Sequence, residues 1–316
     1  MVFKVGTLEA GSPHLLADLI ELIAVLNVDG RAAYRPDDIV SVLEGQPDFS
    51  DNEPRDLRAS VQDAWSQLGY RTGKFDHTYP FTTKGGELRL RASLSPENRL
   101  YRLLLVCSRL RSFERKLRTA WAADFTRLSR EALVQLMPPW SDVRIFDANS
   151  EDRKSYFGTD LRDALIRLGQ DLAASMVKDA ECHAQGPSGD AGIDLVAVAT
   201  WDDHASGIHA ILGQCAARET EWPTKRLQAH AVSFRGMYSF LTDPVNAVFV
   251  PVLFRDTNGK WITDTDASGC LLIDRLRFIL LLKRRGGLSQ LVSQPWFTKF
   301  EKQFDAVAKK IVPAAA

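Results

Sequence analysis

One segment in the second half of the sequence places acidic and amide side chains where two strands would meet. It begins at Asp190, passes through a glycine to Asp194, and continues into an apolar run typical of a buried strand. A second apolar run, after a polar turn, ends at Gln214. If the two runs pair as a hairpin, the Asp194 and Gln214 side chains should lie within about 6 Å of each other. Their oxygens would then suit one divalent cation, because hard cations prefer oxygen ligands.

This spacing resembles that of the PD-(D/E)XK nuclease superfamily, over roughly residues 155 to 255. Members carry an Asp after a glycine-rich turn and then Glu-x-Lys or Gln-x-Lys at the end of the next strand. Here Gly192-Ile193-Asp194-Leu195 matches the first motif, and Gln214 matches the Glu or Gln of the second. The resemblance implies a restriction-endonuclease-like mixed sheet flanked by helices, with Mg²⁺ or Mn²⁺ bound by Asp194 and Gln214. It also implies a metal-dependent DNA endonuclease, often one subunit of a prokaryotic restriction or anti-phage defence system.

The sequence departs from the superfamily pattern at the lysine, because position 216 is Ala216. That lysine normally activates water or stabilises charge on the phosphate, and alanine does neither. One interpretation is that another cation has taken the role: Lys225 is the first choice, and Arg218, which stays protonated, is the second. The other interpretation is a catalytically degenerate nuclease fold that binds nucleic acid or acts as a scaffold. Cys215, one position earlier than Ala216, is expected to face away from the site into the core.

A further metal ligand is expected from a helix that precedes the hairpin. The pair Phe113-Glu114 resembles the Phe-Glu pair that supplies this ligand in some superfamily members, which makes Glu114 a candidate. Asp160 and Asp171 are alternatives, because both fall on the helix expected next to the hairpin. Asp190 either assists the site without binding the metal directly or shapes the turn.

Positive charge is concentrated in one stretch of an otherwise neutral chain. Forty basic and forty acidic residues balance, so nucleic-acid binding must come from a local patch. A helix predicted over residues 100–129 carries Arg109, Arg111, Arg115 and Lys116 near its middle. We interpret these four residues as a phosphate-facing surface for DNA, with the solvated face of an ordinary helix as the alternative. An RNA substrate is a further alternative.

Composition and cysteine usage restrict the class of protein. With 45% hydrophobic and 25% charged residues, the chain is that of a globular protein rather than a disordered one. It has no apolar stretch of membrane-spanning length, and its N-terminus does not resemble a secretory signal. The four cysteines form no CxxC pair, which argues against structural zinc and a disulfide framework. We therefore expect a cytoplasmic protein without a membrane partner.

Residue periodicity predicts a mainly helical N-terminal region, 1–137, and an α/β region, 138–316. The first is expected to resemble a winged helix, with helices at 14–27, 37–43 and 57–68 and strands at 78–83 and 87–91. In the second we expect strands at 143–146, 193–200, 208–215 and 247–254, and helices at 159–177, 225–240 and 271–283.

Overall fold

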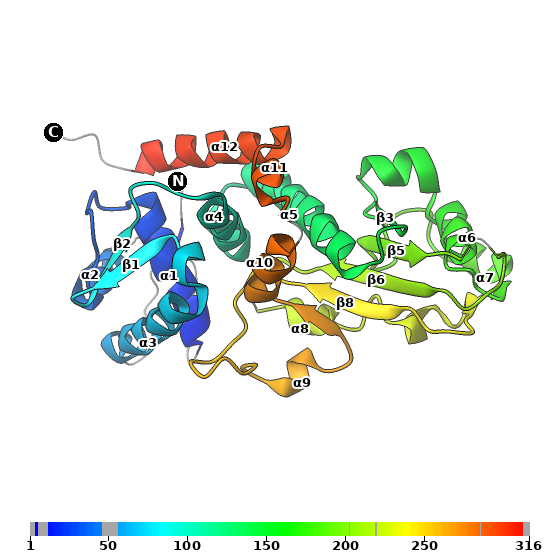
Figure 1. Cartoon of the computed structure of the whole chain (residues 1–316), viewed down its shortest axis with the longest axis horizontal. Helices are drawn as coiled ribbons and strands as arrows, with labels where there is room; N and C mark the ends of the chain where they lie inside the picture. The colour runs from blue at the N-terminus through cyan, green and yellow to red at the C-terminus, as the bar shows by residue number, and fades with distance from the viewer. Residues whose placement is uncertain are drawn as a thin grey trace.

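The computed structural model describes residues 4–5, 12–45, 56–201, 203–218, 220–284 and 286–311. It is an α/β protein in which a mainly helical N-terminal region precedes a mixed five-stranded sheet, so the predicted fold class is confirmed. Figure 1 shows the N-terminal helices beside the sheet, with helix α5 running from these helices onto the sheet and the C-terminal helix α12 lying over the N-terminal region. One apolar core includes side chains of both regions, and the division at 137/138 stays a prediction.

The N-terminal region packs helices around a small antiparallel hairpin. Its elements are α1 (Pro13–Leu26), α2 (Pro36–Glu44), α3 (Leu57–Phe75), η1 (Asp76–Thr78), β1 (Phe81–Lys84), β2 (Glu87–Leu90), α4 (Pro96–Ser108), η2 (Leu110–Ser112) and α5 (Arg115–Leu136). The predicted stop of the third helix at Gly69 is wrong. The helix continues to Phe75, because the buried face that contains Leu68 continues through Arg71 and Phe75.

The single helix predicted over residues 100–129 is also wrong, since the chain breaks between α4 and α5. The break contains the short 3-10 turn η2, and the chain becomes extended at Phe113, where φ is −117°. This turns the Phe113 ring into the core, edge-on to Trp121 with ring centroids 4.8 Å apart. Aromatic burial therefore outweighs continuation of the helix at this point.

The second region contains the five-stranded sheet and the helices on its two faces. Its elements are β3 (Asp142–Ile145), η3 (Arg153–Phe157), α6 (Leu161–Asp171), β4 (Met176–Val177), α7 (Asp179–His183), β5 (Leu195–Ala199), β6 (His209–Cys215), α8 (Trp222–Lys225), η4 (Ala231–Phe234), β7 (Tyr238–Ser239), β8 (Val245–Phe249), α9 (Asp264–Ala267), β9 (Leu271–Ile273), α10 (Arg275–Lys283), α11 (Leu288–Val292) and α12 (Pro295–Ile311).

Three helix predictions in this region need correction. The helix predicted over 159–177 begins after its N-cap Asp160 and ends at Asp171, and Ala173 then adopts a left-handed φ of 47°. The segment 225–240 forms only α8, η4 and β7, and β7 pairs with β4. The segment 271–283 divides at Asp274, which caps α10 and leaves Leu271–Ile273 as the edge strand β9. A short apolar run is compatible with either a helix or a strand, so pairing with a neighbouring strand decides which of the two forms.

The sheet has the order β3-β5-β6-β8-β9. Its first three strands are antiparallel neighbours, and β8 and β9 then run parallel to β6. β5 is buried on both faces, with Leu195 and Ala197 in the core that includes α5 and Val196 and Val198 in the core that includes α6. A strand covered on both faces is a rigid support, and the ends of β3, β5 and β6 carry the candidate site.

Candidate metal centre

The turn before β5 sets the position of two aspartates. Ala191 and Gly192 both have positive φ angles, of 53° and 80°, so the chain reverses within two residues. A Cβ at Gly192 would also lie 3.0 Å from the Gln228 Cβ, so this position favours glycine. The Asp190 Oδ1 accepts a hydrogen bond from the Gly192 N–H at 2.9 Å. The turn therefore holds the Asp190 carboxylate beside that of Asp194.

Asp194 and Gln214 lie side by side, which confirms the predicted geometry. The Asp194 N–H donates to the Gly213 carbonyl at 2.9 Å, which places Asp194 opposite Gln214 across the hairpin. The Asp194 Oδ2 accepts hydrogen bonds from the Gln214 Nε2 at 2.6 Å and from the Cys215 N–H at 2.7 Å. The Gln214 side chain is buried, and its Oε1 has no hydrogen-bond partner within the described part of the chain. An unpartnered buried amide oxygen is costly unless a ligand satisfies it.

A third aspartate, Asp147, completes the group, and the sequence analysis missed it. Asp147 follows β3, whose last residue pairs with Leu195 of β5. The main-chain N–H groups of Phe146 and Asp147 donate to the Asp194 carbonyl at 2.7 and 3.3 Å. The carboxylate oxygens of Asp147, Asp190 and Asp194, here named the acidic cluster, all lie within 4.8 Å of one another. The available signal was an aspartate directly after the first strand expected in the second region.

The charges of Arg153 and Lys225 act on the acidic cluster without an ion pair among the described residues. Burial, and then the charges of Asp190 and Asp147, raise the pKa of Asp194 to about 7. The Cys215 N–H and the charge of Lys225 act in the opposite direction. Within the described residues, no arginine or lysine forms an ion pair with any member of the cluster. A divalent cation bound here would remove both the repulsion and the deficit of charge.

Arg153 fixes the two loops that carry Asp147 and Asp190. The Arg153 side chain is buried, and its Nη1 donates to the carbonyl oxygens of Phe146 at 3.3 Å and Gly189 at 3.1 Å. These carbonyls belong to the residues that immediately precede the two aspartates. Arg153 is therefore a positioning residue, because it joins the loops from behind without contacting the carboxylates.

The candidates for the missing lysine come from one short segment. Lys225 is the last residue of α8 rather than the start of a longer helix, and its charge lowers the pKa of Asp194. Arg218 forms an ion pair with Glu221 instead. Ala216 is 2% exposed and packs in an apolar cluster that includes a residue of α8.

The helix carboxylates considered from the sequence lie outside the acidic cluster. Glu114 is the exposed N-cap residue of α5. Asp160 caps α6 and pairs with Arg162 at 2.5 Å, and Asp171 accepts a hydrogen bond from the Tyr156 hydroxyl at 3.0 Å. The carboxylates that join Asp194 come instead from the loops around β3 and β5.

The four basic residues predicted to face DNA lie in different environments. Arg109 is buried, and its Nη2 donates to the Val5 carbonyl at 2.7 Å. Arg111 pairs with Glu221 across to the segment before α8. Arg115 and Lys116 are exposed in the first turn of α5. The break between α4 and α5 thus separates residues that a continuous helix would have aligned, and their DNA contact stays a prediction.

The acidic cluster opens into a cleft of about 740 Å³ between α5 and the ends of the sheet strands. Asp147 and Asp194 line one side, and residues of α5 line the other. Cys215 also lines this cleft, and its side chain packs against the apolar core, as expected. It is the last residue of β6, and its side chain on the α5 face reaches the cleft. Burial, and then the charge of Asp194, raise the pKa of the Cys215 thiol, which keeps it protonated.

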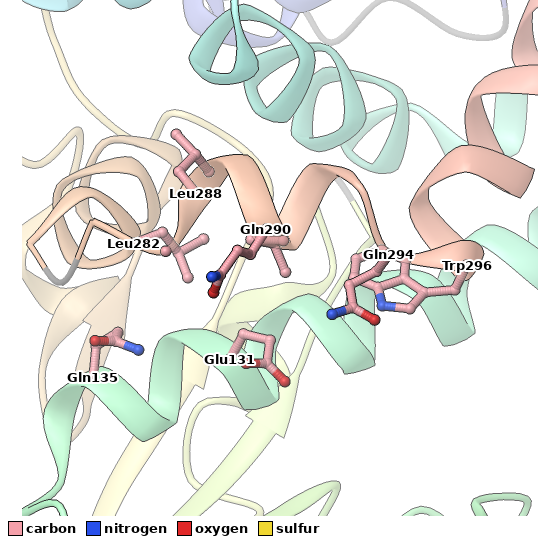
Figure 2. Close-up of a pocket in the computed structure, with 9 residues that line it drawn as sticks. Glu131, Gln135, Leu282, Leu288, Gln290, Gln294 and Trp296 are labelled. Carbon is pink, nitrogen blue, oxygen red and sulfur yellow. The ribbon is translucent and has the colours of Figure 1, made fainter.

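Figure 2 shows a second hollow, of about 300 Å³, between the C-terminal half of α5 and the segment from α10 to α12. Glu131 and Gln135 come from α5, Gln290 lies above them on α11, and Trp296 stands at one end. The one carboxylate among its lining residues, Glu131, pairs with Arg130 at 3.0 Å. This hollow therefore lacks the group of three carboxylates that the acidic cluster provides.

The chain matches no family model, no curated protein and no solved structure in the comparisons made. The resemblance to the PD-(D/E)XK superfamily therefore rests on the motif and on the site itself. Among the described helices, none combines the length and the apolar character required to cross a lipid bilayer.

Proposed function

We propose that the chain is a Mg²⁺- or Mn²⁺-dependent nuclease that hydrolyses phosphodiester bonds of DNA. The observation that carries the proposal is the acidic cluster, which lies beside the buried Gln214 amide, whose Oε1 has no partner among the described residues. All of these donors are oxygens, the ligand type that Mg²⁺ and Mn²⁺ prefer over nitrogen or sulfur. The cleft beside them offers space for a substrate.

Asp147, Asp190 and Asp194 would hold the ion, together with Gln214 after its amide turns its oxygen toward them. Such an ion supplies a nucleophilic water near neutral pH and polarises the phosphate. Rotation of the amide leaves the backbone in place, since the O and N atoms simply exchange positions. The Cys215 N–H would still orient the Asp194 carboxylate.

Lys225 is the residue we propose in place of the lysine that Ala216 lacks. Its support is electrostatic, since its charge acts on Asp194 while Arg218 is paired with Glu221. Lys225 would stabilise charge on the phosphate or help position the attacking water. Its removal should leave metal binding largely intact, because it is not a ligand.

The second candidate is a degenerate nuclease fold that binds nucleic acid or acts as a scaffold, and Ala216 is the observation that favours it. A role in prokaryotic restriction or anti-phage defence, with other subunits as partners, is proposed from the resemblance alone.

Cleavage of plasmid DNA, with a structured RNA in parallel, tests the proposal in Mg²⁺ and in Mn²⁺. We expect the parent chain to cut DNA, Lys225→Ala to cut about 10²-fold more slowly, and Asp194→Ala to lose both metal and cleavage. Full activity in Lys225→Ala would reject the role of Lys225. An inactive parent that is rescued by Ala216→Lys would favour the degenerate fold.

A further inference from the structure

The cleft beside the acidic cluster has two walls of opposite charge. One wall carries Asp147 and Asp194, together with further carboxylates from the loop at 149–152. The opposite wall is one face of α5, with Arg118 near one end and Arg127 near the other. The α5 residues in this wall are Arg118, Thr119, Ala122, Ala123, Phe125, Thr126 and Arg127. Arg118 and Arg127 lie two and a half turns apart, so they stand at opposite edges of the wall.

The two arginines differ from the basic residues singled out in the sequence, because both line the cleft. In the described part of the chain, the Arg118 side chain forms no ion pair or hydrogen bond, and it is exposed. Arg127 is half-exposed and donates from Nη1 to the Asp124 Oδ1 at 2.7 Å. Asp124 is itself buried, so it orients the Arg127 guanidinium and leaves its other N–H groups available to a ligand.

We propose that this face of α5 binds the phosphodiester backbone of the substrate through Arg118 and Arg127. The inference rests on the proposed function and assigns the part of the cleft that holds the nucleic acid. A polyanion is repelled by the acidic wall, and its phosphates therefore need cations on the other side as well as a metal ion. Ala122 and Ala123, between the arginines, leave room for the backbone to approach the helix.

The spacing of the arginines sets the length of the site. They are nine residues apart, which corresponds to roughly 14 Å at the rise of an α-helix. One DNA strand advances about 3.4 Å per nucleotide along the duplex axis and also winds around that axis, so the two guanidinium groups would contact phosphates about two nucleotides apart. The acidic cluster, on the facing wall, would then act on a phosphodiester bond within this span.

Equilibrium binding of a fluorescent 20-base-pair DNA duplex to the full chain tests the inference, in Ca²⁺ and over a range of NaCl concentrations. Arg118→Gln and Arg127→Gln should each weaken binding on the order of tenfold and lower the salt slope by about 0.9. Glutamine keeps good helix propensity, so α5 should persist in both variants, which circular dichroism checks. Lys302→Gln is the control, because it removes one positive charge from an exposed position of α12 outside the cleft and should leave the slope unchanged.

The outcomes separate this inference from the proposed function. If the parent binds duplex and both cleft variants keep its affinity and salt slope, the inference is overturned while the nuclease proposal stands. If the cleft variants lose binding but the parent does not cut DNA in Mg²⁺ or Mn²⁺, the inference stands and the hydrolytic proposal fails. A parent that binds Mn²⁺ but no DNA overturns both.

Discussion

Two groups of buried charge have opposite composition. In the first, Asp18 and Glu21 of α1 meet Arg71 of α3 in the N-terminal region and Arg275 of α10 from the second region, and all four side chains are fully buried. We name these four residues the buried ion network. Their closest contacts join Arg71 and Arg275 to Asp18, both at 2.7 Å. Two negative charges thus face two positive ones, in the absence of water.

Most of the remaining hydrogen-bonding capacity of the network is also used, although the Arg71 Nε has no hydrogen-bond partner among the described residues. Glu21 accepts from the Tyr79 hydroxyl at 2.6 Å and from the Tyr101 hydroxyl at 2.9 Å. Arg275 donates to the Ser108 hydroxyl at 3.0 Å. In the acidic cluster, by contrast, three carboxylates lie close together without an ion pair among the described residues. The neighbouring Gln214 Oε1 also has no hydrogen-bond partner there.

The difference indicates what each group does. Opposite charges in contact with one another hold α1, α3 and α10 together and leave no charge for a ligand to neutralise. Like charges without an ion-pair partner destabilise the fold, and they are tolerated where a ligand supplies the missing charge. On this comparison the buried ion network is structural, and the acidic cluster is a binding site.

The largest effect is expected when the buried ion network is broken. Arg275→Met removes one of its two cations and leaves Asp18 and Glu21 with Arg71 alone. Breaking a buried ion pair from one side costs about 3–5 kcal/mol, because the remaining charge stays desolvated. Urea denaturation should show this loss in the free energy of unfolding, without a change in Mn²⁺ affinity of the protein that remains folded. An unchanged urea midpoint would contradict the structural role of the network.

The second prediction concerns Asp194→Asn, which should have the opposite effect on the metal-free protein. Replacing a desolvated carboxylate that neighbours two others removes repulsion, so the free energy of unfolding should stay the same or rise. The parent should gain about 2.7 kcal/mol at a Mn²⁺ concentration 100 times its Kd, and the variant should gain nothing. Thermal denaturation with and without Mn²⁺ measures both. Equal stabilisation of the two proteins would place the metal elsewhere.

The sequence was sufficient to predict the hairpin at the centre of the candidate site. Leu195–Ala199 and the run that ends at Gln214 are apolar segments of strand length separated by a polar turn, so their pairing is a local property. That pairing alone brings Asp194 beside Gln214. Asp147 could not be found in this way, because its position depends on β3 pairing with β5 across about fifty residues.

The buried ion network could not be predicted from periodicity either. The helix predicted at 14–27 was expected to be amphipathic, yet α1 is buried on every side from His14 to Leu26. Its two acidic residues are neutralised by arginines that lie far away in sequence, since Arg71 is 53 positions and Arg275 is 257 positions after Asp18. Local patterns place such residues on a surface, and only tertiary contacts bury them.

The third prediction is a pH dependence that belongs to the acidic cluster. The pKa of Asp194 is about 7 in the metal-free fold, above its usual value of 3.8. Between these values the folded state keeps a proton that the unfolded state has lost, so stability falls as pH rises, by about 1.4 kcal/mol per pH unit. Urea denaturation at pH 5, 6 and 7 measures the free energy of unfolding of the metal-free parent and of Asp194→Asn. Relative to the variant, the parent should lose stability with rising pH at this slope. If the free energies of unfolding of the two proteins changed equally with pH, Asp194 would already be ionised below neutral pH.

The smallest effect is expected at the exposed ion pairs that also join the two regions. Glu221 accepts hydrogen bonds from Arg111, next to α5, and from Arg218, after β6. These side chains are all at least 40% exposed, so water and salt screen their charges and their long side chains lose entropy when they pair. Arg111→Met should therefore leave the urea midpoint unchanged within error at 0.15 M NaCl, in contrast to Arg275→Met. If Arg111→Met lowered the free energy of unfolding as much as Arg275→Met, solvent exposure would not distinguish weak ion pairs from strong ones in this protein. The exposed ion pairs would then hold the N-terminal region to the sheet together with the buried contacts.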